Sequence, residues 1–400
     1  MDQNDRLAIN GGNPVRNQYL PYAKQWIDSE DIKAVEEVLQ DDFLTTGPKV
    51  TQFEQKMAQY VGAKYAVSFI NGTAALHAAC YAANIQFGDE VITTPLSFVA
   101  TANCILYHGA LPVFADIDPS TYNISPKSIQ SLITEKTKAI IPVDFSGQAC
   151  DYDEILLIAK KNNLIVIEDA AHALGAKYKG KSIGSISDMT MFSFHPVKHI
   201  TTGEGGIITT NNEEFYEKLV QFRNHGITRD FKKFKNNDGP WFYEMQLLGF
   251  NYRLNDIQAA LGISQLKKIN KFISIRKKYV ELYNQAFADM SSIQIPKQLQ
   301  GSDSSWHLYV IRLNLEKLSC DRKTIFEALQ KENIGINVHY IPIYLHPFYQ
   351  SIGYKKGLCP IAEKTYEEII TLPLFPLMSE EDVMDVIKGV KKVISYYSLK

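Results

Sequence analysis

Cysteine is scarce in this sequence, which has five cysteines among 400 residues. They stand at positions 80, 104, 150, 320 and 359, and no two of them form a CxxC spacing. An odd number of widely scattered cysteines argues against a disulfide framework and against a zinc site. It favours a protein of a reducing compartment.

The sequence also lacks an excess of charge of one sign and long apolar runs. Lysine and arginine total 42 against 44 acidic residues, without the basic excess typical of proteins that bind nucleic acid or anionic membranes. No run approaches the ~18 apolar residues that a membrane span needs, and the polar N-terminus lacks the apolar core of a signal peptide. We therefore expect a cytoplasmic protein with no nucleic acid and no membrane among its partners.

What the sequence does contain is an alternation of short apolar runs and helical patterns. Seven runs rich in valine, isoleucine, phenylalanine and threonine lie at residues 65–69, 90–94, 112–116, 139–145, 164–170, 190–194 and 206–210. Several are apolar almost throughout, as strands covered on both faces are. Because helical patterns lie between the early runs, the order predicts an α/β fold with a mainly parallel central sheet and helices on both faces.

The length predicts two domains, because 400 residues are more than one hydrophobic core usually spans. A long polar helix at about residues 264–287 leads from the strand and helix alternation into shorter α+β patterns. We place the boundary at residue 262. The prediction is a large domain over 1–262, including an N-terminal arm, and a small C-terminal α+β domain over 263–400.

The stretch 229–245 interrupts this order with charged residues and an Asn-Asp-Gly-Pro turn, which indicate a loop. Its aromatic residues are Phe231, Phe234, Trp241, Phe242 and Tyr243. Two interpretations stay open. Either the loop packs on a partner or covers a site, or its aromatic side chains are buried within their own chain.

Gly72 and Thr73 belong to NGTAALHAA (71–79), which follows the first apolar run. A small turn that opens a helix presents free backbone N–H groups and the positive end of the helix, which suits a phosphate. Asn-Gly before a helix is also an ordinary cap. Taken alone, the segment favours this second interpretation.

Asp169 comes at the end of the apolar run in IVIEDAAHALGA (165–176), where open α/β sheets place their ligands. A buried carboxylate needs a positive partner or several hydrogen-bond donors, and a protonated pyridine nitrogen is one such partner. The alternative, equally favoured by these residues alone, is that Glu168 and Asp169 cap a following helix.

Lys198 lies in SFHPVKHITTGEGGIITT (193–210), between the end of one run and a glycine-rich turn that leads into the next. Apolar surroundings lower the pKa of a lysine, so that it acts as nucleophile and base. We expect Gly203, Gly205 and Gly206 to let the backbone pass close to a bulky planar ligand.

These segments, in this order and spacing, resemble the nucleotide-sugar aminotransferases, a family of fold-type I enzymes that use pyridoxal 5'-phosphate (PLP). The resemblance covers essentially the whole chain. It includes INGGNPVR near the start, FLTTGPKVTQFEQKMAQYVGAKYAVSFINGTAALHAA, and GFNYRLNDIQAALGISQL at residues 249–266.

The resemblance implies that PLP is the cofactor and gives each motif a role. Lys198 corresponds to the lysine that forms a Schiff base with PLP and moves a proton, and Asp169 to the carboxylate that keeps the pyridine nitrogen protonated. The other implied cofactor contacts are Gly72, Thr73 and Ser193 at the phosphate, Phe98 stacked on the ring, and His172 at the ring hydroxyl. Many relatives carry glutamine at the position of His172.

The family also implies an obligate homodimer with shared active sites. Asn251 matches an asparagine that reaches the cofactor phosphate from the neighbouring subunit, although by itself it is a turn-former before a helix. Arg253, two residues on, is expected to assist and to contact substrate. His339 and Tyr340 match a motif near the nucleotide-sugar pocket, although by composition alone they would be assigned to core packing.

The implied reaction moves an amino group from L-glutamate to a keto group of a UDP-linked sugar. Segments such as FSFHPVKHITTGEGG, NVHYIPIYLHPFYQ and TLPLFP (371–376) resemble most the subgroup that forms UDP-4-amino-4,6-dideoxy-N-acetyl-β-L-altrosamine at C4 in pseudaminic acid biosynthesis. The alternative is another UDP- or dTDP-linked keto sugar, such as the D-xylo epimer of the bacillosamine route.

Other classes of protein fit the sequence less well. A sugar dehydratase of this fold carries histidine in place of the Schiff-base lysine, whereas Lys198 is present and His199 takes the next position. A non-catalytic regulator would be expected to lose Lys198, Asp169 or the phosphate ligands. A nicotinamide dehydrogenase would need GxGxxG after its first strand, and none follows.

Overall fold

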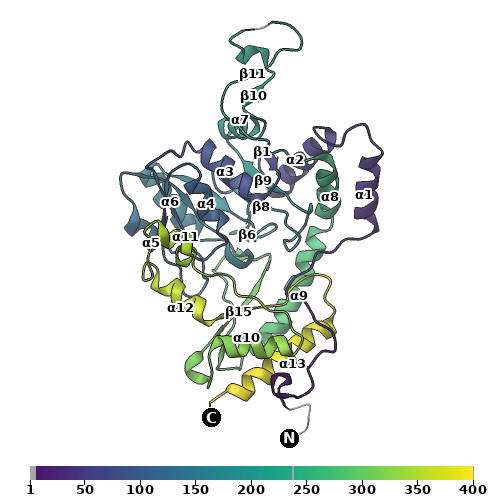
Figure 1. The fold of residues 1–400 in the computed structure, drawn as a ribbon, viewed down its shortest axis with the longest axis vertical. Helices are drawn as coiled ribbons and strands as arrows, with labels where there is room; N and C mark the ends of the chain where they lie inside the picture. The colour runs from purple at the N-terminus through teal and green to yellow at the C-terminus, as the bar shows by residue number, and fades with distance from the viewer. Residues whose placement is uncertain (1–5, 237, 400) are drawn as a thin grey trace.

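A seven-stranded sheet forms the centre of the larger of two lobes in the computed structural model, which describes residues 6–236 and 238–399 (Figure 1). Its strand order is β1-β9-β8-β5-β4-β2-β3. The strands are β1 (Tyr65–Phe69), β2 (Glu90–Thr93), β3 (Leu111–Phe114), β4 (Thr137–Ile141), β5 (Ile165–Asp169), β8 (Met189–Ser193) and β9 (Gly206–Thr210). All are parallel to their neighbours except β9, which is antiparallel to β1 and β8. All seven expected strands and the mainly parallel α/β sheet are confirmed.

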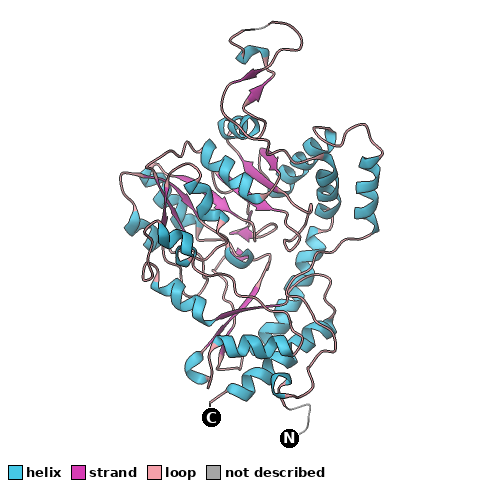
Figure 2. Ribbon diagram, in the orientation of Figure 1, coloured by secondary structure: helices cyan, strands magenta, loops and turns pink. Residues whose placement is uncertain are grey.

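Helices cover both faces of this sheet (Figure 2). One face packs against α2 (Pro48–Val61), α5 (Pro126–Leu132) and α6 (Tyr152–Asn162), and the other against α3 (Gly72–Ala82), α4 (Ala100–Leu106) and α7 (Glu213–Phe222). Successive strand residues point to opposite faces, so Val166 of β5 lies in the first hydrophobic cluster and Ile167 in the second. Burial on both faces explains why these strands are apolar almost throughout.

The smaller lobe has its own core, which includes residues from near both ends of the described chain (Figure 1). It contains α10 (Arg322–Lys331), α13 (Glu380–Tyr397), β12 (Ile293–Gln294), β14 (Tyr309–Leu313) and β15 (Ile369–Leu372). The long helix α9 (Ile269–Phe287) joins the lobes: Ile273 packs in the core of the sheet, whereas Tyr279 packs in the core of the smaller lobe. Leu7 and Leu20 of the N-terminal arm also pack in the smaller lobe. The division at residue 262 stays a prediction.

The polar helix expected at about 264–287 is divided in two. Helix α8 (Asp256–Leu266) ends first, and α9 begins at Ile269. Between them Lys268 makes ion pairs with Asp28 at 2.8 Å and Asp31 at 2.6 Å. The break therefore lies where the chain is fixed by a contact with α1 (Ser29–Leu39).

The remaining elements are short. They are α11 (Pro347–Ser351), α12 (Pro360–Glu368), β6 (Lys177–Tyr178), β7 (Lys181–Ser182), β13 (Ser302–Asp303), and the 3-10 turns η1 (Ala8–Asn10), η2 (Phe145–Gly147), η3 (Phe231–Lys233), η4 (Leu315–Lys317) and η5 (Ile343–Leu345). Within the described parts of the chain, no helix combines the length and the apolar character needed to span a membrane.

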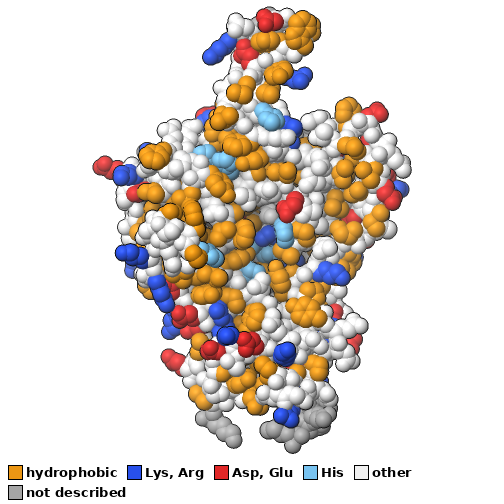
Figure 3. Space-filling model, viewed as in Figure 1, with side chains coloured by type: hydrophobic (Ala, Val, Ile, Leu, Met, Phe, Trp, Pro, Cys, Tyr) orange, Lys and Arg blue, Asp and Glu red, His pale blue; other side chains and the backbone are white. Residues whose placement is uncertain are grey.

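The loop expected at 229–245 extends away from the sheet as a projecting arm (Figure 1). Its base is a two-stranded pairing of β10 (Ile227–Thr228) with β11 (Glu244–Met245). Phe231 and Trp241 are 70% and 73% exposed, and hydrophobic side chains lie along the arm in Figure 3. The interpretation that its aromatic side chains are buried within their own chain is therefore wrong.

Candidate active site

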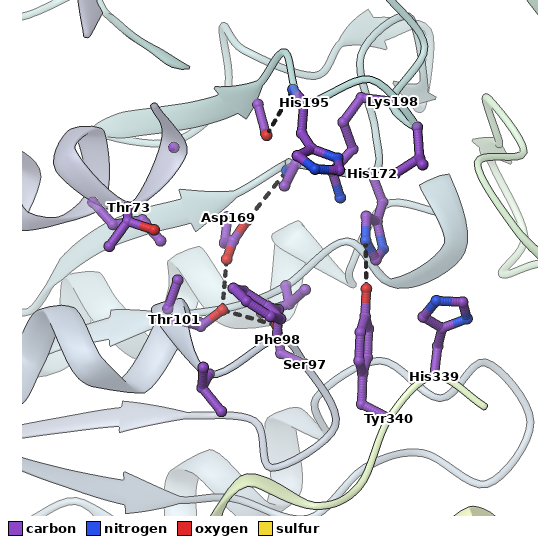
Figure 4. A pocket seen from close by; sticks show the side chains of 18 of the residues that line it. Thr73, Ser97, Phe98, Thr101, Asp169, His172, His195, Lys198, His339 and Tyr340 are labelled. Atoms are coloured by element: carbon purple, nitrogen blue, oxygen red, sulfur yellow. Dashed lines mark hydrogen bonds between the residues drawn. The ribbon is translucent and has the colours of Figure 1, made fainter. Parts of the chain in front are cut away.

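A cavity of about 850 Å³ opens at the carboxyl ends of three neighbouring parallel strands, β4, β5 and β8. Parallel α/β sheets bind their ligands at this edge. Segments far apart in the chain line the cavity: the start of α3, the turn before α4, the β8–β9 connection and residues 337–341 of the smaller lobe. Nine expected site residues line it, namely Gly72, Thr73, Phe98, Asp169, His172, Ser193, Lys198, His339 and Tyr340 (Figure 4).

One end of the cavity lies at the start of α3. Asn71 caps α3 by accepting a hydrogen bond from the N–H of Ala74 at 2.8 Å, so the cap interpretation of this segment is also correct. The first N–H groups of a helix have no partner inside it, and those of Gly72 and Thr73 lie at the cavity wall. A Cβ on Gly72 would stand 3.3 Å from Sδ of Met191 and 3.6 Å from Oγ of Ser193. Glycine at this position therefore keeps open the space between the helix end and the serine hydroxyl.

Glycines in the turn after Lys198 make room for protein backbone, whereas we expected them to make room for a ligand. A Cβ on Gly206 would stand 2.5 Å from the carbonyl oxygen of Asn71 and 2.7 Å from the nitrogen of Gly72. Glycine thus lets β9 approach the backbone that begins α3. The expectation that Gly205 and Gly206 make room for a planar ligand is wrong, because protein atoms fill that space.

Asp169 lies at the end of β5, almost fully buried, and it does not cap a helix. The residues from Ala171 to Ala176 form turns, and the next element is β6, so the capping alternative is wrong. Its Oδ2 accepts a hydrogen bond from Oγ1 of Thr101 at 2.7 Å, and its Oδ1 accepts one from the N–H of Ala171 at 3.2 Å. The pKa of this carboxyl is raised overall, because the effect of burial exceeds the lowering by the Thr101 hydroxyl, the Ala171 N–H and the charge of Lys198.

Lys198 reaches the cavity from the connection between β8 and β9 (Figure 4). The backbone of that connection is held by hydrogen bonds from Phe194 N to Gly205 O at 2.9 Å and from Lys198 N to His195 O at 2.9 Å. Removal from water lowers the pKa of Lys198 to about 8, and the charge of Asp169 opposes part of that change. Half of the amine is therefore uncharged at about pH 8, far below the pH at which a solvated lysine loses its proton.

Phe98 and His172 supply two further walls of the cavity. Phe98 is 59% exposed although it is aromatic, so its ring has a free face toward the cavity. Nε2 of His172 pairs with the hydroxyl of Tyr340 at 3.1 Å, and its Nδ1 has no partner among the described residues. Burial, and then the charge of Lys198, hold the pKa of His172 well below its usual range. The imidazole is thus neutral.

His339 and Tyr340 come from the smaller lobe, so the cavity lies between the two lobes. Nδ1 of His339 pairs with Oγ1 of Thr371 at 2.8 Å, and burial together with the charge of Lys198 lowers the pKa of His339 to about 3. The Tyr340 hydroxyl is already paired with His172. Both residues line the cavity, but their polar atoms have protein partners.

Asn251 and Arg253 do not line this cavity in the single chain. Asn251 is exposed and forms an isolated backbone bridge with Asn224. Arg253 donates to Oδ1 of Asn224 at 2.7 Å, and its Nε has no hydrogen-bond partner among the described residues. The carbonyl of Tyr252 accepts from the N–H of Ile70 at 2.8 Å. The segment therefore lies at the base of the projecting arm, beside the strand that leads into α3.

The sequence matches the DegT/DnrJ/EryC1/StrS aminotransferase family over residues 25–391. The chain belongs to this family. This confirms the resemblance to the nucleotide-sugar aminotransferases, and it establishes the protein as a PLP-dependent aminotransferase.

The similarity of this chain to three relatives extends over most of the length of each relative. The chain is 47% identical over 382 residues to the uncharacterized protein MJ1066 of Methanocaldococcus jannaschii, covering 95% of this chain and 99% of the relative. It is 43% identical over 381 residues to the spore coat polysaccharide biosynthesis protein SpsC of Bacillus subtilis, covering 95% and 98%. It is 39% identical over 366 residues to the UDP-4-amino-4,6-dideoxy-N-acetyl-beta-L-altrosamine transaminase of Campylobacter jejuni, covering 91% and 94%.

Solved structures of similar proteins share the whole architecture. Helicobacter pylori PseC, an aminotransferase involved in the biosynthesis of pseudoaminic acid, superposes with a TM-score of 0.89 at 36% identity, covering 95% of this chain and 100% of that one. The PLP form of the putative sugar aminotransferase Spr1654 of Streptococcus pneumoniae gives 0.89 at 32% identity, covering 94% and 99%.

The aminotransferase cavity fits PLP by the chemistry of its donors. A phosphate suits the N–H groups of Gly72 and Thr73 beside the Ser193 hydroxyl, where a Cβ would fill the space. A protonated pyridine nitrogen suits the buried carboxylate of Asp169, and an aldehyde suits the amine of Lys198.

Sequence reasoning missed the residues that hold these groups in position. Thr101, which donates to Asp169, and Ser97, which pairs with Thr101 at 2.8 Å, both lie in TTPLSFVATAN. Only two hydroxyl residues four apart at the start of a helix pointed to them, and this spacing also occurs at ordinary caps. His307, whose ring lies 4.4 Å from that of His172, had no signal at all.

The low pKa of Lys198 predicts selective chemistry in the cofactor-free protein. Labelling with a small amine-reactive reagent, read by mass spectrometry of peptides, should rise for Lys198 with a midpoint near pH 8, against about 10.4 for a solvated lysine. In Asp169→Asn the midpoint should move lower, because the charge that favours the ammonium is lost. The exposed Lys177 serves as internal control. A midpoint for Lys198 near that of a solvated lysine would contradict the electrostatics described here.

Proposed function

We propose that the enzyme transfers an amino group from L-glutamate to C4 of a UDP-linked 4-keto-6-deoxy-N-acetylhexosamine, forming UDP-4-amino-4,6-dideoxy-N-acetyl-β-L-altrosamine for pseudaminic acid biosynthesis. The observation that carries the aminotransfer is one cavity that holds Lys198 and Asp169 at the strand ends. The choice of sugar is supported by the likeness to the Campylobacter transaminase and to PseC. L-Glutamate is proposed as the amino donor because it is the usual donor in this family.

The pocket residues divide the chemistry among them. Bound PLP supplies an electron sink for negative charge that develops on the reacting carbon. Asp169 holds the proton on the ring nitrogen, and Lys198, with its pKa near 8, accepts and returns the proton at the substrate carbon. The remaining proposed contacts are Gly72, Thr73 and Ser193 for the phosphate, Phe98 for the ring face and His172 for the ring hydroxyl.

The sugar occupies the outer part of the cavity, between the sheet and the smaller lobe. His339 and Tyr340 form the wall on that side. Since their polar atoms are paired with Thr371 and His172, we infer that these two residues contact the sugar mainly through their ring surfaces. Arg253 is the remaining proposed substrate contact, offered from a second copy of the chain.

We further propose that the enzyme is a homodimer in which each subunit contributes to both active sites. The projecting arm exposes Trp241, Met245 and Leu248 at 73%, 64% and 78%. Exposed apolar clusters of this kind are typical of interaction surfaces. We propose that the arm packs on the second subunit.

A cytoplasmic location is part of the same proposal. All five cysteines are free thiols, which supports a reducing compartment.

Asn251 is expected to act across the dimer interface. Lys198→Ala and Asn251→Ala subunits should each be nearly inactive alone, because each site of the pure dimers lacks one group. After subunit exchange, half of the dimers in an equal mixture carry one intact site and one doubly altered site, so activity should return to about a quarter of wild type. Exchange is verified with a mass tag on one variant. Exchanged dimers without activity would show that Asn251 serves its own chain or is structural.

The sugar is expected to be UDP-2-acetamido-2,6-dideoxy-β-L-arabino-hexos-4-ulose. With L-glutamate as donor, kcat/KM for this substrate should exceed that for its D-xylo epimer, and that for dTDP-linked keto sugars, by at least about tenfold, because epimers direct their ring substituents at different parts of the cavity wall. Preference for the D-xylo epimer or for a dTDP-linked sugar would overturn the substrate proposal. It would leave the aminotransferase chemistry intact.

A further inference from the structure

Three buried oxygen groups form a continuous hydrogen-bonded chain that ends on Asp169 (Figure 4). Oγ of Ser97 lies 2.8 Å from Oγ1 of Thr101, which lies 2.7 Å from Oδ2 of Asp169. The exposed fractions of Ser97, Thr101 and Asp169 are 5%, 1% and 4%. Buried hydroxyls without partners are costly, so these residues form a connected polar unit beneath the cavity.

The chemistry of hydroxyl groups fixes the direction of this chain. An ionised carboxylate only accepts hydrogen bonds, and a threonine hydroxyl has one proton to give. The Thr101 proton is therefore directed to Asp169, and Ser97 must donate to the Thr101 oxygen. A protonated Asp169 would carry its own O–H and could donate it to Thr101, which would reverse the direction of this hydrogen bond. The Thr101 hydroxyl thus stabilises the ionised carboxylate and opposes the larger effect of burial, which raises the pKa of Asp169.

The backbone around Thr101 links this chain to the wall of the cavity. Thr101 stands in the first turn of α4, and its N–H donates to the carbonyl of Phe98 at 3.2 Å. Threonine in a helix commonly turns its hydroxyl back to a carbonyl of the preceding turn; here the hydroxyl is turned outward, to a side chain on β5. One turn therefore positions both the aromatic wall and the donor to the carboxylate.

We propose that Thr101 is a positioning residue that holds Asp169 ionised and oriented toward the pyridine nitrogen of PLP, and that Ser97 directs the Thr101 proton. This proposal rests on the proposed role of Asp169. Oδ2 is fixed by Thr101, and Oδ1 by the Ala171 N–H. Each carboxylate oxygen keeps a further lone pair for the ring N–H. Loss of the Thr101 hydroxyl would weaken the interaction of the Asp169 carboxylate with the ring N–H, although Asp169 and PLP would both remain in the site.

The test uses five variants of the whole enzyme loaded with 15N-labelled PLP, of which the fifth, Asp169→Asn, tests the proposed role of Asp169 itself. Thr101→Val keeps the shape and removes the hydroxyl, Thr101→Ser keeps the hydroxyl, and Ser97→Ala removes the outer donor. The matched control is Thr93→Val, because the Thr93 hydroxyl is equally buried but donates to the carbonyl of Ile141, at 2.8 Å. The readouts are the 15N resonance of the ring nitrogen, which reports its protonation, and kcat and KM for the reaction with L-glutamate.

In Thr101→Val the ring nitrogen should move toward its unprotonated resonance, and kcat should fall about tenfold or more with KM changed less, since hydrogen bonds to charged groups are the stronger ones. Thr101→Ser should retain the wild-type resonance, and Thr93→Val should match wild type. Ser97→Ala should shift the resonance in the same direction as Thr101→Val by a smaller amount, and it decides the question if Thr101→Val does not fold.

A wild-type resonance and kcat in Thr101→Val, or in Ser97→Ala when the valine variant does not fold, would overturn the positioning role. Asp169→Asn separates this outcome from failure of the proposed function. If Asp169→Asn also keeps a protonated ring nitrogen, the role of Asp169 is wrong. If Asp169→Asn loses the ring proton and Thr101→Val does not, only the present inference is wrong.

Discussion

Two ionisable groups of opposite sign, Lys198 and Asp169, share one cavity, and the surrounding structure is arranged to accommodate both. Burial alone would neutralise each of them. The hydrogen bonds to Asp169 and the mutual attraction of the two charges oppose that tendency. The result is a carboxylate that can hold a proton on a bound ring and an amine that can lose its own near pH 8. These are the two properties that aminotransfer requires.

The sheet determines where these groups meet. Asp169 and Ser193 end neighbouring parallel strands, and Gly206 lets β9 lie against the start of α3. The anion site of α3 is thereby brought beside the carboxylate and the lysine. The smaller lobe closes the cavity from the other side through Tyr340, whose hydroxyl contacts His172 across 168 positions of sequence. The walls of the cavity therefore come from both lobes, which α9 joins.

Much of this arrangement was predictable from the sequence, and the reason differs between features. Strands such as β5 were predictable because residues buried on both faces are apolar at successive positions. Lys198, Asp169 and Gly72 were expected in one site because their segments together resemble one family, whereas the segments of Asp169 and Gly72 alone fitted a helix cap at least as well. Thr101 was not predictable, since its hydroxyl contacts a strand 68 positions away. Neither was the break between α8 and α9, because Lys268 meets its partners Asp28 and Asp31 only in the folded chain. The aromatic residues of the projecting arm could have been buried or exposed as far as composition tells, and only the structure shows that side chains such as Trp241 are exposed.

The central claim, that Lys198 carries the cofactor in this cavity, is tested most directly by chemical reduction. Treatment of the PLP-loaded enzyme with borohydride fixes the cofactor to the lysine that holds it, and digestion followed by mass spectrometry identifies that lysine. The account predicts the label on Lys198 alone, and no label in Lys198→Ala. A label on any other lysine, or a labelled Lys198→Ala variant, would contradict it.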